Sequence, residues 1–177
     1  MAFRTRRDPD AEPNTDTAAA RESALKLLER SRRTRSDLER RLRDKGFAAP
    51  TITEVVDRLA EVGLVNDAEY ARAFLAGRWG RKPAGWSRLQ RELRAKGVDD
   101  EAITAGRGLI EEREGAADEL ALARKLLAQL SARYAALEPR VRNQRLYALL
   151  ARRGFDGDTI RRVLALREDA GEDSSET

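Results

Sequence analysis

The feature that most constrains the fold of this chain is a Leu-x3-Leu-x3-Gly signature that occurs three times. The copies end at Gly46, Gly97 and Gly154, and an apolar residue follows each glycine. Leucines four residues apart lie on one face of a helix and can be buried together. Glycine adopts the left-handed conformation that ends a helix, and the next apolar residue can fold back onto the last turn. Each signature therefore predicts an amphipathic helix closed by a glycine cap.

Each signature lies inside a longer unit of three predicted helices. A second helix is expected after each glycine, and a third before each signature, at 18–30, 67–77 and 117–134. One such unit is near the lower size limit for independent folding, so neighbouring units are expected to stack into an elongated, curved, solenoid-like rod. The predicted fold is all-α, with three tandem three-helix repeats at 18–65, 66–113 and 114–167.

Start signals support these helices. Ser36 with Glu39, and Ser87 with Gln90, have the capping-box spacing that satisfies free amides at a helix start. The helices after the glycines have residues suited to their first turn or N-cap, namely Pro50, Asp99 and Asp156, and Asn66 is suited to cap the helix at 67–77.

The two ends of the chain have a different composition. Residues 1–17 are expected to be a disordered leader, because the stretch 8–16 contains two prolines, four acids and no large apolar side chain. Residues 168–177 form an acidic tail that is also expected to be disordered. Cysteine is absent, and no run of eighteen apolar residues occurs. A cytoplasmic protein that does not span a membrane is therefore expected.

The composition removes most catalytic chemistry. Histidine and cysteine are both absent, which eliminates the commonest general bases, zinc ligands and nucleophile pairs. The acids at 99–101 are explained by the helix start that they are predicted to occupy. The glycines at 77–80 and 106–108 match neither a P-loop nor a dinucleotide fingerprint. The sequence predicts a non-enzymatic protein with no cofactor and no metal.

Basic residues are concentrated in the middle of the chain, where Glu92 is the only acid between positions 72 and 96. Such a density favours an anionic partner, either nucleic acid or an acidic protein groove. A solvated helix face is the alternative, and a cation in the last helical turn such as Lys96 also complements the helix dipole. The candidate binding residues are Arg40, Arg43, Arg78, Arg81, Lys82, Arg88, Arg91, Arg94 and Lys96. Trp79 and Trp86 could stack on exposed bases, although aromatic residues at such a turn more often pack a corner.

Three stretches resemble the bacterial regulatory protein RecX family. They are Ser-Asp-Leu-Glu-Arg-Arg-Leu-Arg-Asp-Lys-Gly-Phe at 36–47, Gly-Leu-Val-Asn-Asp-Ala-Glu-Tyr-Ala-Arg-Ala-Phe at 63–74 and Leu-Gln-Arg-Glu-Leu-Arg-Ala-Lys-Gly-Val at 89–98. The resemblance runs from about residue 20 to residue 166. The chain departs from the family pattern at Pro83 and Ala84, and at Ala148 and Ala151, where the third repeat has lost positive charge.

The resemblance implies a modulator of the recombinase RecA that binds in the groove of the RecA–DNA filament. It also implies inhibition of filament extension, ATP hydrolysis and strand exchange, and the expected partners are the RecA filament and single- or double-stranded DNA. We expect a monomer. Two alternatives remain open, a stand-alone helical DNA-binding module and a helical scaffold with no anionic partner.

Overall fold

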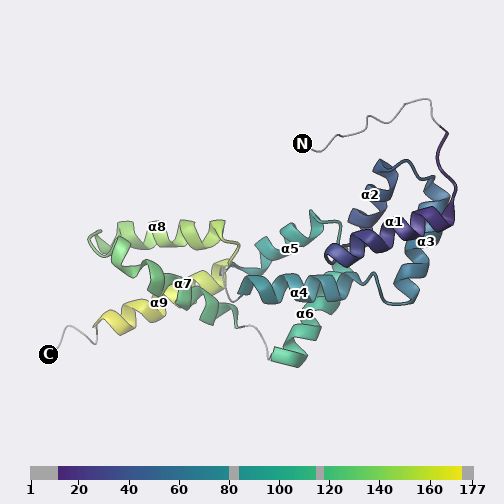
Figure 1. Cartoon of the computed structure of the whole chain (residues 1–177). Coiled ribbons are helices and arrows are strands. Elements are labelled where there is room, and N and C mark those ends of the chain that lie inside the picture. Colours follow the sequence, from purple (N-terminus) through teal and green to yellow (C-terminus); the bar gives the residue numbers. More distant parts are fainter. Residues whose placement is uncertain (1–11, 80–83, 115–117, 173–177) are drawn as a thin grey trace. The chain divides into compact units, whose positions relative to one another are not determined.

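The computed structural model describes residues 12–79, 84–114 and 118–172, and these are almost entirely helical. The only β pairing in the described residues is an isolated bridge between Asn14 and Phe47, so the all-α prediction is confirmed. The helices, which Figure 1 labels, are α1 (Thr17–Arg30), α2 (Arg35–Asp44), α3 (Ala49–Glu61), α4 (Asp67–Trp79), α5 (Trp86–Arg94), α6 (Asp100–Glu114), α7 (Glu119–Tyr134), α8 (Pro139–Arg152) and α9 (Gly157–Glu172).

The described residues form two compact units. The first unit holds the residues up to Ala71 together with Arg94–Gly106, and the second holds Arg72–Leu93 and the residues from Arg107 onward. The division between the units passes through α4, α5 and α6, which are the helices of the predicted second repeat. The curved rod stays a prediction.

In the first unit, α1, α2 and α3 pack against one another around the first signature. Leu38 and Leu42 are fully buried, as their spacing predicts, and Phe47 after the glycine joins the same core with Ile52 and Val56 of α3. These residues lie on the apolar faces of helices that expose Arg and Glu on the other side. Burial of these faces is the main favourable contribution to the stability of the repeat.

The second unit contains the equivalent arrangement of α7, α8 and α9. Leu146 and Leu150 of the third signature are buried together with Phe155 and with Ile160 of α9. Leu89 and Leu93 of the second signature are fully buried as well. The leucine register inferred from the sequence therefore holds in all three copies.

The glycine caps are confirmed. Gly46, Gly97 and Gly154 have φ angles of 94°, 79° and 87°, in the left-handed region that side chains with a Cβ rarely adopt. In the first copy, the Phe47 amide donates to the Leu42 carbonyl at 3.3 Å, which folds the apolar side chain back onto the last turn.

The predicted capping boxes at Ser36 and Ser87 are wrong. α2 begins at Arg35, and its N-cap is Thr34, whose hydroxyl accepts from the Asp37 amide at 3.1 Å. α5 begins one residue before Ser87, at Trp86. The other predicted caps are confirmed, because carboxylate or amide oxygens of Asn66, Asp99 and Asp156 accept from backbone amides three residues later.

The same type of contact between consecutive repeats occurs in both units. In the first unit the amide of Arg35, the first residue of α2, donates to the Asp67 carboxylate at 2.9 Å. In the second unit the amide of Trp86, the first residue of α5, donates to the Glu119 carboxylate at the same distance. Burial raises the pKa of both carboxyl groups, and these hydrogen bonds oppose the rise. In two places, therefore, an acid at the start of one repeat caps the signature helix of the repeat before it.

The predicted leader and tail are partly described. Residues 1–11 and 173–177 lie outside the described residues. The Asn14 amide donates to the Gly46 carbonyl at 2.8 Å, and the Asn14 carbonyl accepts from the Ala48 amide. The Asp16 side chain accepts from the Ala19 amide and caps α1. At the other end, α9 continues to Glu172 and so includes the first residues of the predicted acidic tail.

Candidate anion-binding site

A basic cavity of about 480 Å³ lies in the first unit, beside the start of α2. Asp37 is the one acidic residue among those that line it. The basic residues of the lining come from two distant parts of the chain and are Arg32, Arg33, Arg40, Arg41, Arg94 and Lys96. We refer to this cavity as the α2 pocket. Its charge makes it a candidate site for an anion.

A close backbone approach builds the α2 pocket. The Thr34 hydroxyl donates to the Lys96 carbonyl at 2.8 Å, so Thr34 both caps α2 and anchors the turn after α5. At that turn Gly97 lies against Ser36 so closely that a Cβ on Gly97 would be 2.3 Å from the Ser36 Cβ. Only glycine allows this distance. The close approach places Arg94 and Lys96 beside the arginines around α2.

Asp37 organises the arginines of the α2 pocket. Its carboxylate accepts from Arg33 Nη1 at 2.9 Å and from Arg41 Nε at 2.8 Å, and it also pairs with Arg40. Burial raises the pKa of Asp37, but hydrogen bonds from Arg41 and Arg33 outweigh it, so the pKa lies below its ordinary value. One carboxylate cannot neutralise three guanidinium groups, so the pocket keeps a positive charge. Arg33 Nε is buried without a hydrogen-bond partner in the described residues, which adds an unused donor.

The structure divides the predicted binding residues between the two units. Arg40, Arg94 and Lys96 line the α2 pocket, and Arg94 Nε also donates to Asp100 at 2.7 Å. Arg43 is exposed on α2 but does not line the pocket. The remaining predicted residues belong to the second unit or lie outside the described residues.

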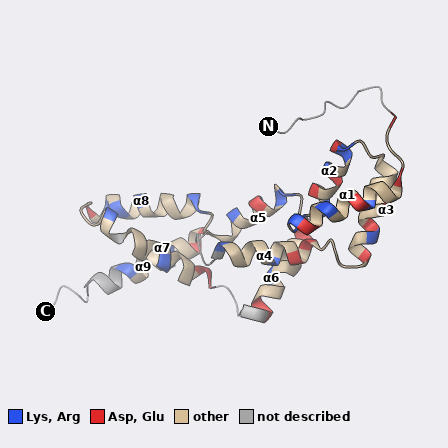
Figure 2. Ribbon diagram, in the orientation of Figure 1, with Lys and Arg blue, Asp and Glu red and all other residues tan. Residues whose placement is uncertain are grey.

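In the second unit, Glu92 pairs with two of the predicted cations. Arg78 Nη2 lies 2.9 Å from Glu92 Oε2, and Arg88 Nε lies 2.9 Å from Glu92 Oε1. Arg78 also lies over the Phe74 ring, with its Cζ 5.3 Å from the ring centroid. Arg91 is exposed and donates to the Ser87 carbonyl. Glu92 thus partly compensates the charge of this block, and Figure 2 shows an acidic segment between basic ones on α5.

The tryptophan at the start of α5 is part of the packing. Trp86 is half-buried, and the Arg107 guanidinium lies over its ring, with Cζ 4.7 Å from the centroid. That contact covers one face of the ring, which supports the packing interpretation for Trp86. Arg81, Lys82 and the side chain of Trp79 lie outside the described residues.

Sequence reasoning missed three arginines of the α2 pocket, namely Arg32, Arg33 and Arg41. A signal was present, because the short segment between α1 and α2 is rich in arginine. It did not stand out, since the acids of the first repeat make that stretch less basic overall than the block around α5.

In the described part of the chain, no group of three or more His, Cys, Asp or Glu residues could hold a metal ion. Among the same residues, no helix is both long and apolar enough to cross a membrane.

Family models match the chain in three consecutive segments. The first three-helix domain of RecX matches residues 20–59, the second matches 66–106 and the third matches 117–164. The prediction of three tandem three-helix repeats is therefore confirmed. The solved structure of RecX from Lactobacillus salivarius has the same fold, with a TM-score of 0.76 at 23% identity over 85% of this chain and 95% of that one. A second RecX crystal structure matches with a TM-score of 0.71 at 22% identity, over 83% of this chain and 72% of that one.

Curated relatives carry the name regulatory protein RecX. The relative from Mycobacterium sp. strain JLS is 42% identical over 98 residues, which cover 55% of this chain and 53% of the relative, so this match spans about half of that protein. The relative from Mycobacterium tuberculosis strain ATCC 25177 / H37Ra is 37% identical over 155 residues, which cover 86% of this chain and 87% of the relative. With all three domains matched and nearly the whole length of a relative aligned, the chain belongs to the RecX family.

Proposed function

We propose that this protein regulates the recombinase RecA by binding in the groove of the RecA–DNA filament and inhibiting filament extension, ATP hydrolysis and strand exchange. Membership of the RecX family is the observation that carries the proposal. In this proposal the chain acts as a monomer in the cytoplasm, needs no cofactor and catalyses no reaction itself.

The α2 pocket supplies a physical basis for such binding. Its guanidinium groups match carboxylate and phosphate groups in geometry and charge, and a protein–DNA filament offers both. Because Asp37 already fixes Arg33 and Arg41 in place, less side-chain entropy is lost when an anion binds. Tandem repeats that contact successive parts of one filament would also bind more tightly than a single repeat. Once one repeat is bound, the others meet their sites at a high effective concentration.

A RecA ATPase assay on single-stranded DNA tests the proposal. Added in less than stoichiometric amounts, the protein is expected to lower the rate of ATP hydrolysis. Arg94→Gln combined with Lys96→Gln should weaken this inhibition, because both residues line the α2 pocket. A matched control is Lys26→Gln with Arg58→Gln, which removes the same charge from exposed residues of the same unit outside the pocket. Hydrolysis that stays unchanged across a wide titration would contradict the proposal.

The alternative is a helical DNA-binding module that acts without RecA, and the basic lining of the α2 pocket also favours it. If phosphate contacts dominate, the affinity for bare duplex DNA should fall with salt with a log–log slope of roughly −0.9 per phosphate neutralised. Tight, strongly salt-dependent binding to bare DNA with no effect on RecA would favour this alternative. Weak binding that is insensitive to salt would reject it.

A further inference from the structure

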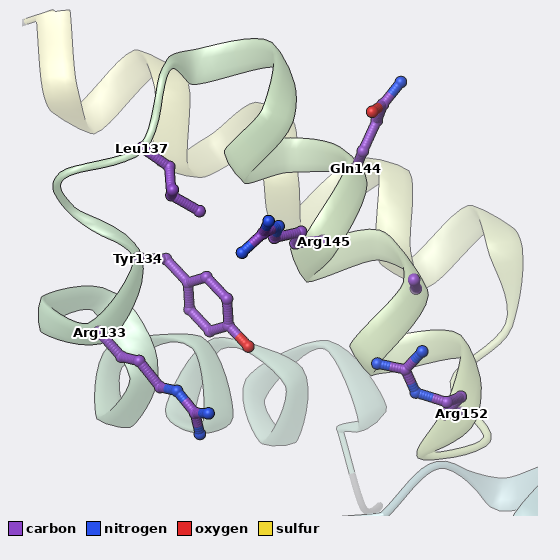
Figure 3. Close-up of a pocket in the computed structure, with 7 residues that line it drawn as sticks. Arg133, Tyr134, Leu137, Gln144, Arg145 and Arg152 are labelled. Carbon is purple, nitrogen blue, oxygen red and sulfur yellow. The ribbon is translucent and has the colours of Figure 1, made fainter.

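A second basic cavity, of about 380 Å³, lies in the third repeat between α7 and α8. We refer to it as the α7–α8 pocket. Its walls include three arginines, one tyrosine and two small or aliphatic residues, namely Arg133, Arg145, Arg152, Tyr134, Leu137 and Ala148. Figure 3 shows the Tyr134 ring between the side chains of Arg133 and Arg145, with Arg152 further along α8. None of the predicted binding residues lines this pocket.

The repeat register explains why the pocket exists. Ala148 occupies the position of Arg40 in the first repeat and Arg91 in the second, counted from the signature glycine. A methyl group there leaves open the space that a long side chain would fill. The alanine at position 148 therefore removes a positive charge and also leaves room for the pocket. Arg145 and Arg152 lie on the same face of α8 on either side of this alanine.

The same register explains the charge of the α7–α8 pocket. Arg145 takes the place of Asp37, the acid that pairs with the arginines of the α2 pocket. In the described part of the chain, the side chains of Arg145 and Arg152 make no ion pair or hydrogen bond, and the pocket lining contains no acid. Arg78 and Arg88, by contrast, share Glu92. The two arginines of α8 therefore have their full hydrogen-bonding capacity available to an external anion.

Tyr134 gives the pocket an aromatic surface. The side chain is half-buried against the core of the third repeat. The Arg133 guanidinium lies over the ring, with Cζ 5.8 Å from the centroid, so a ligand can stack only on the opposite face of the ring. An aromatic ring held beside guanidinium groups is the arrangement on which unstacked nucleobases bind, because the base stacks while the cations hold the backbone. In a duplex the bases are already stacked, so such a surface favours a single strand.

We propose that the α7–α8 pocket binds one nucleotide unit of a single-stranded nucleic acid. The base stacks on Tyr134, and Arg145 and Arg152 bind flanking phosphates. These two arginines are two helical turns apart, about 10 Å along α8, so they suit neighbouring phosphates better than a single one. The volume is near the lower end of the range for small-molecule sites, about 300–1,000 Å³. The inference rests on the proposed function, in which nucleic acid is part of the target, and it adds a contact in the third repeat.

Fluorescence anisotropy with a labelled oligothymidylate and the full-length protein, without RecA, tests this site. Arg145→Gln should reduce the slope of log affinity against log salt by about 0.7, the value for one phosphate contact on a single strand. Arg162→Gln is the matched control, since it removes one exposed cation of the same repeat outside the pocket. Tyr134→Leu, which keeps an apolar side chain, should weaken binding about fivefold or more, and should have no such effect with an abasic oligonucleotide.

Ala148→Arg distinguishes binding in the pocket from non-specific electrostatic attraction. This substitution adds a positive charge but fills the pocket with the residue found in the other two repeats. If the pocket binds a nucleotide, the affinity for oligothymidylate should fall despite the added charge. An increase in affinity, or equal effects of Arg145→Gln and Arg162→Gln, would overturn the proposal. Competition by polyglutamate that is as strong as competition by unlabelled oligonucleotide would also overturn the proposal, because the pocket would then select only for negative charge. Since RecA is absent, these outcomes are independent of the ATPase test of the proposed function.

Discussion

The approach of Gly97 to Ser36 gives the sharpest test of how this fold creates its site. Gly97 and Gly63 both belong to the first unit and both have a left-handed φ, of 79° and 75°. They differ in surroundings. A Cβ on Gly63 would have no atom within 4 Å, whereas a Cβ on Gly97 would lie 2.3 Å from the Ser36 Cβ and 2.4 Å from its Oγ.

The two alanine substitutions should therefore have different costs. Gly63→Ala should lower the free energy of unfolding by about 1–2 kcal/mol, the cost of placing a Cβ in the left-handed conformation. Gly97→Ala bears the same cost and must also displace Ser36 from the turn, which adds about 1–3 kcal/mol, as for overpacked cores. In a protein of this size, each kcal/mol lowers the Tm by roughly 2–4 °C.

Urea unfolding of a double-mutant cycle would measure the difference. Ser36→Gly removes the atoms that the new Cβ would meet, so Gly97→Ala in that background should cost only about as much as Gly63→Ala. Gly97→Ala alone should also weaken anion binding, because it moves Arg94 and Lys96 away from α2. Equal costs for Gly97→Ala and Gly63→Ala, or no recovery with Ser36→Gly, would refute the reasoning.

Three further predictions concern the core, the acid stability and the charge of α5. Leu93→Ala should lower the free energy of unfolding by about 2–5 kcal/mol in urea titration, because Leu93 is fully buried, and a near-neutral result would contradict the repeat register. Asp37→Asn should lower it by about 1–3 kcal/mol at pH 7 through lost hydrogen bonds to Arg33 and its neighbours. The pKa of Asp37 is lowered in the folded protein, so its stabilisation is present above the unfolded pKa of about 3.9 and is lost as pH falls through the lower folded value. The gap between the Asp37→Asn variant and the parent should therefore close in acid unfolding measurements below about pH 4, and a gap independent of pH would argue against this role. Glu92→Gln should tighten binding of single-stranded DNA roughly two- to fivefold in anisotropy, because it releases Arg88 from its ion pair; unchanged affinity would mean that this cation does not contact DNA.

The sequence predicted the local structure well where it depends on neighbouring residues. The glycine caps at Gly46, Gly97 and Gly154 follow from backbone conformation alone, and the caps at Asp99 and Asp156 need only amides three residues away. The start of α2 was misplaced because Thr34 and Ser36 are both suitable caps by type. Packing decided between them, since Ser36 lies against Gly97 and Thr34 is left to accept from the Asp37 amide.

The binding residues were predictable only in part. The sequence identified the basic block around α5, but it could not reveal that Arg78 and Arg88 share Glu92, because the ion pair to Arg78 joins two different helices. It likewise assigned Ala148 to a repeat that had lost charge. Only the packing of α7 against α8 makes that alanine part of a cavity.

The sequence by itself determined the all-α class, the three repeats and the buried leucine register, because each depends on a periodicity within one helix and its cap. The tertiary structure alone decided where positive charge is available. The α2 pocket exists because Thr34 and Lys96, which are 62 residues apart, meet at a glycine that has no side chain to separate them. Electrostatic potential depends on distance in space, and a distance of that kind is set by the packing of several helices together.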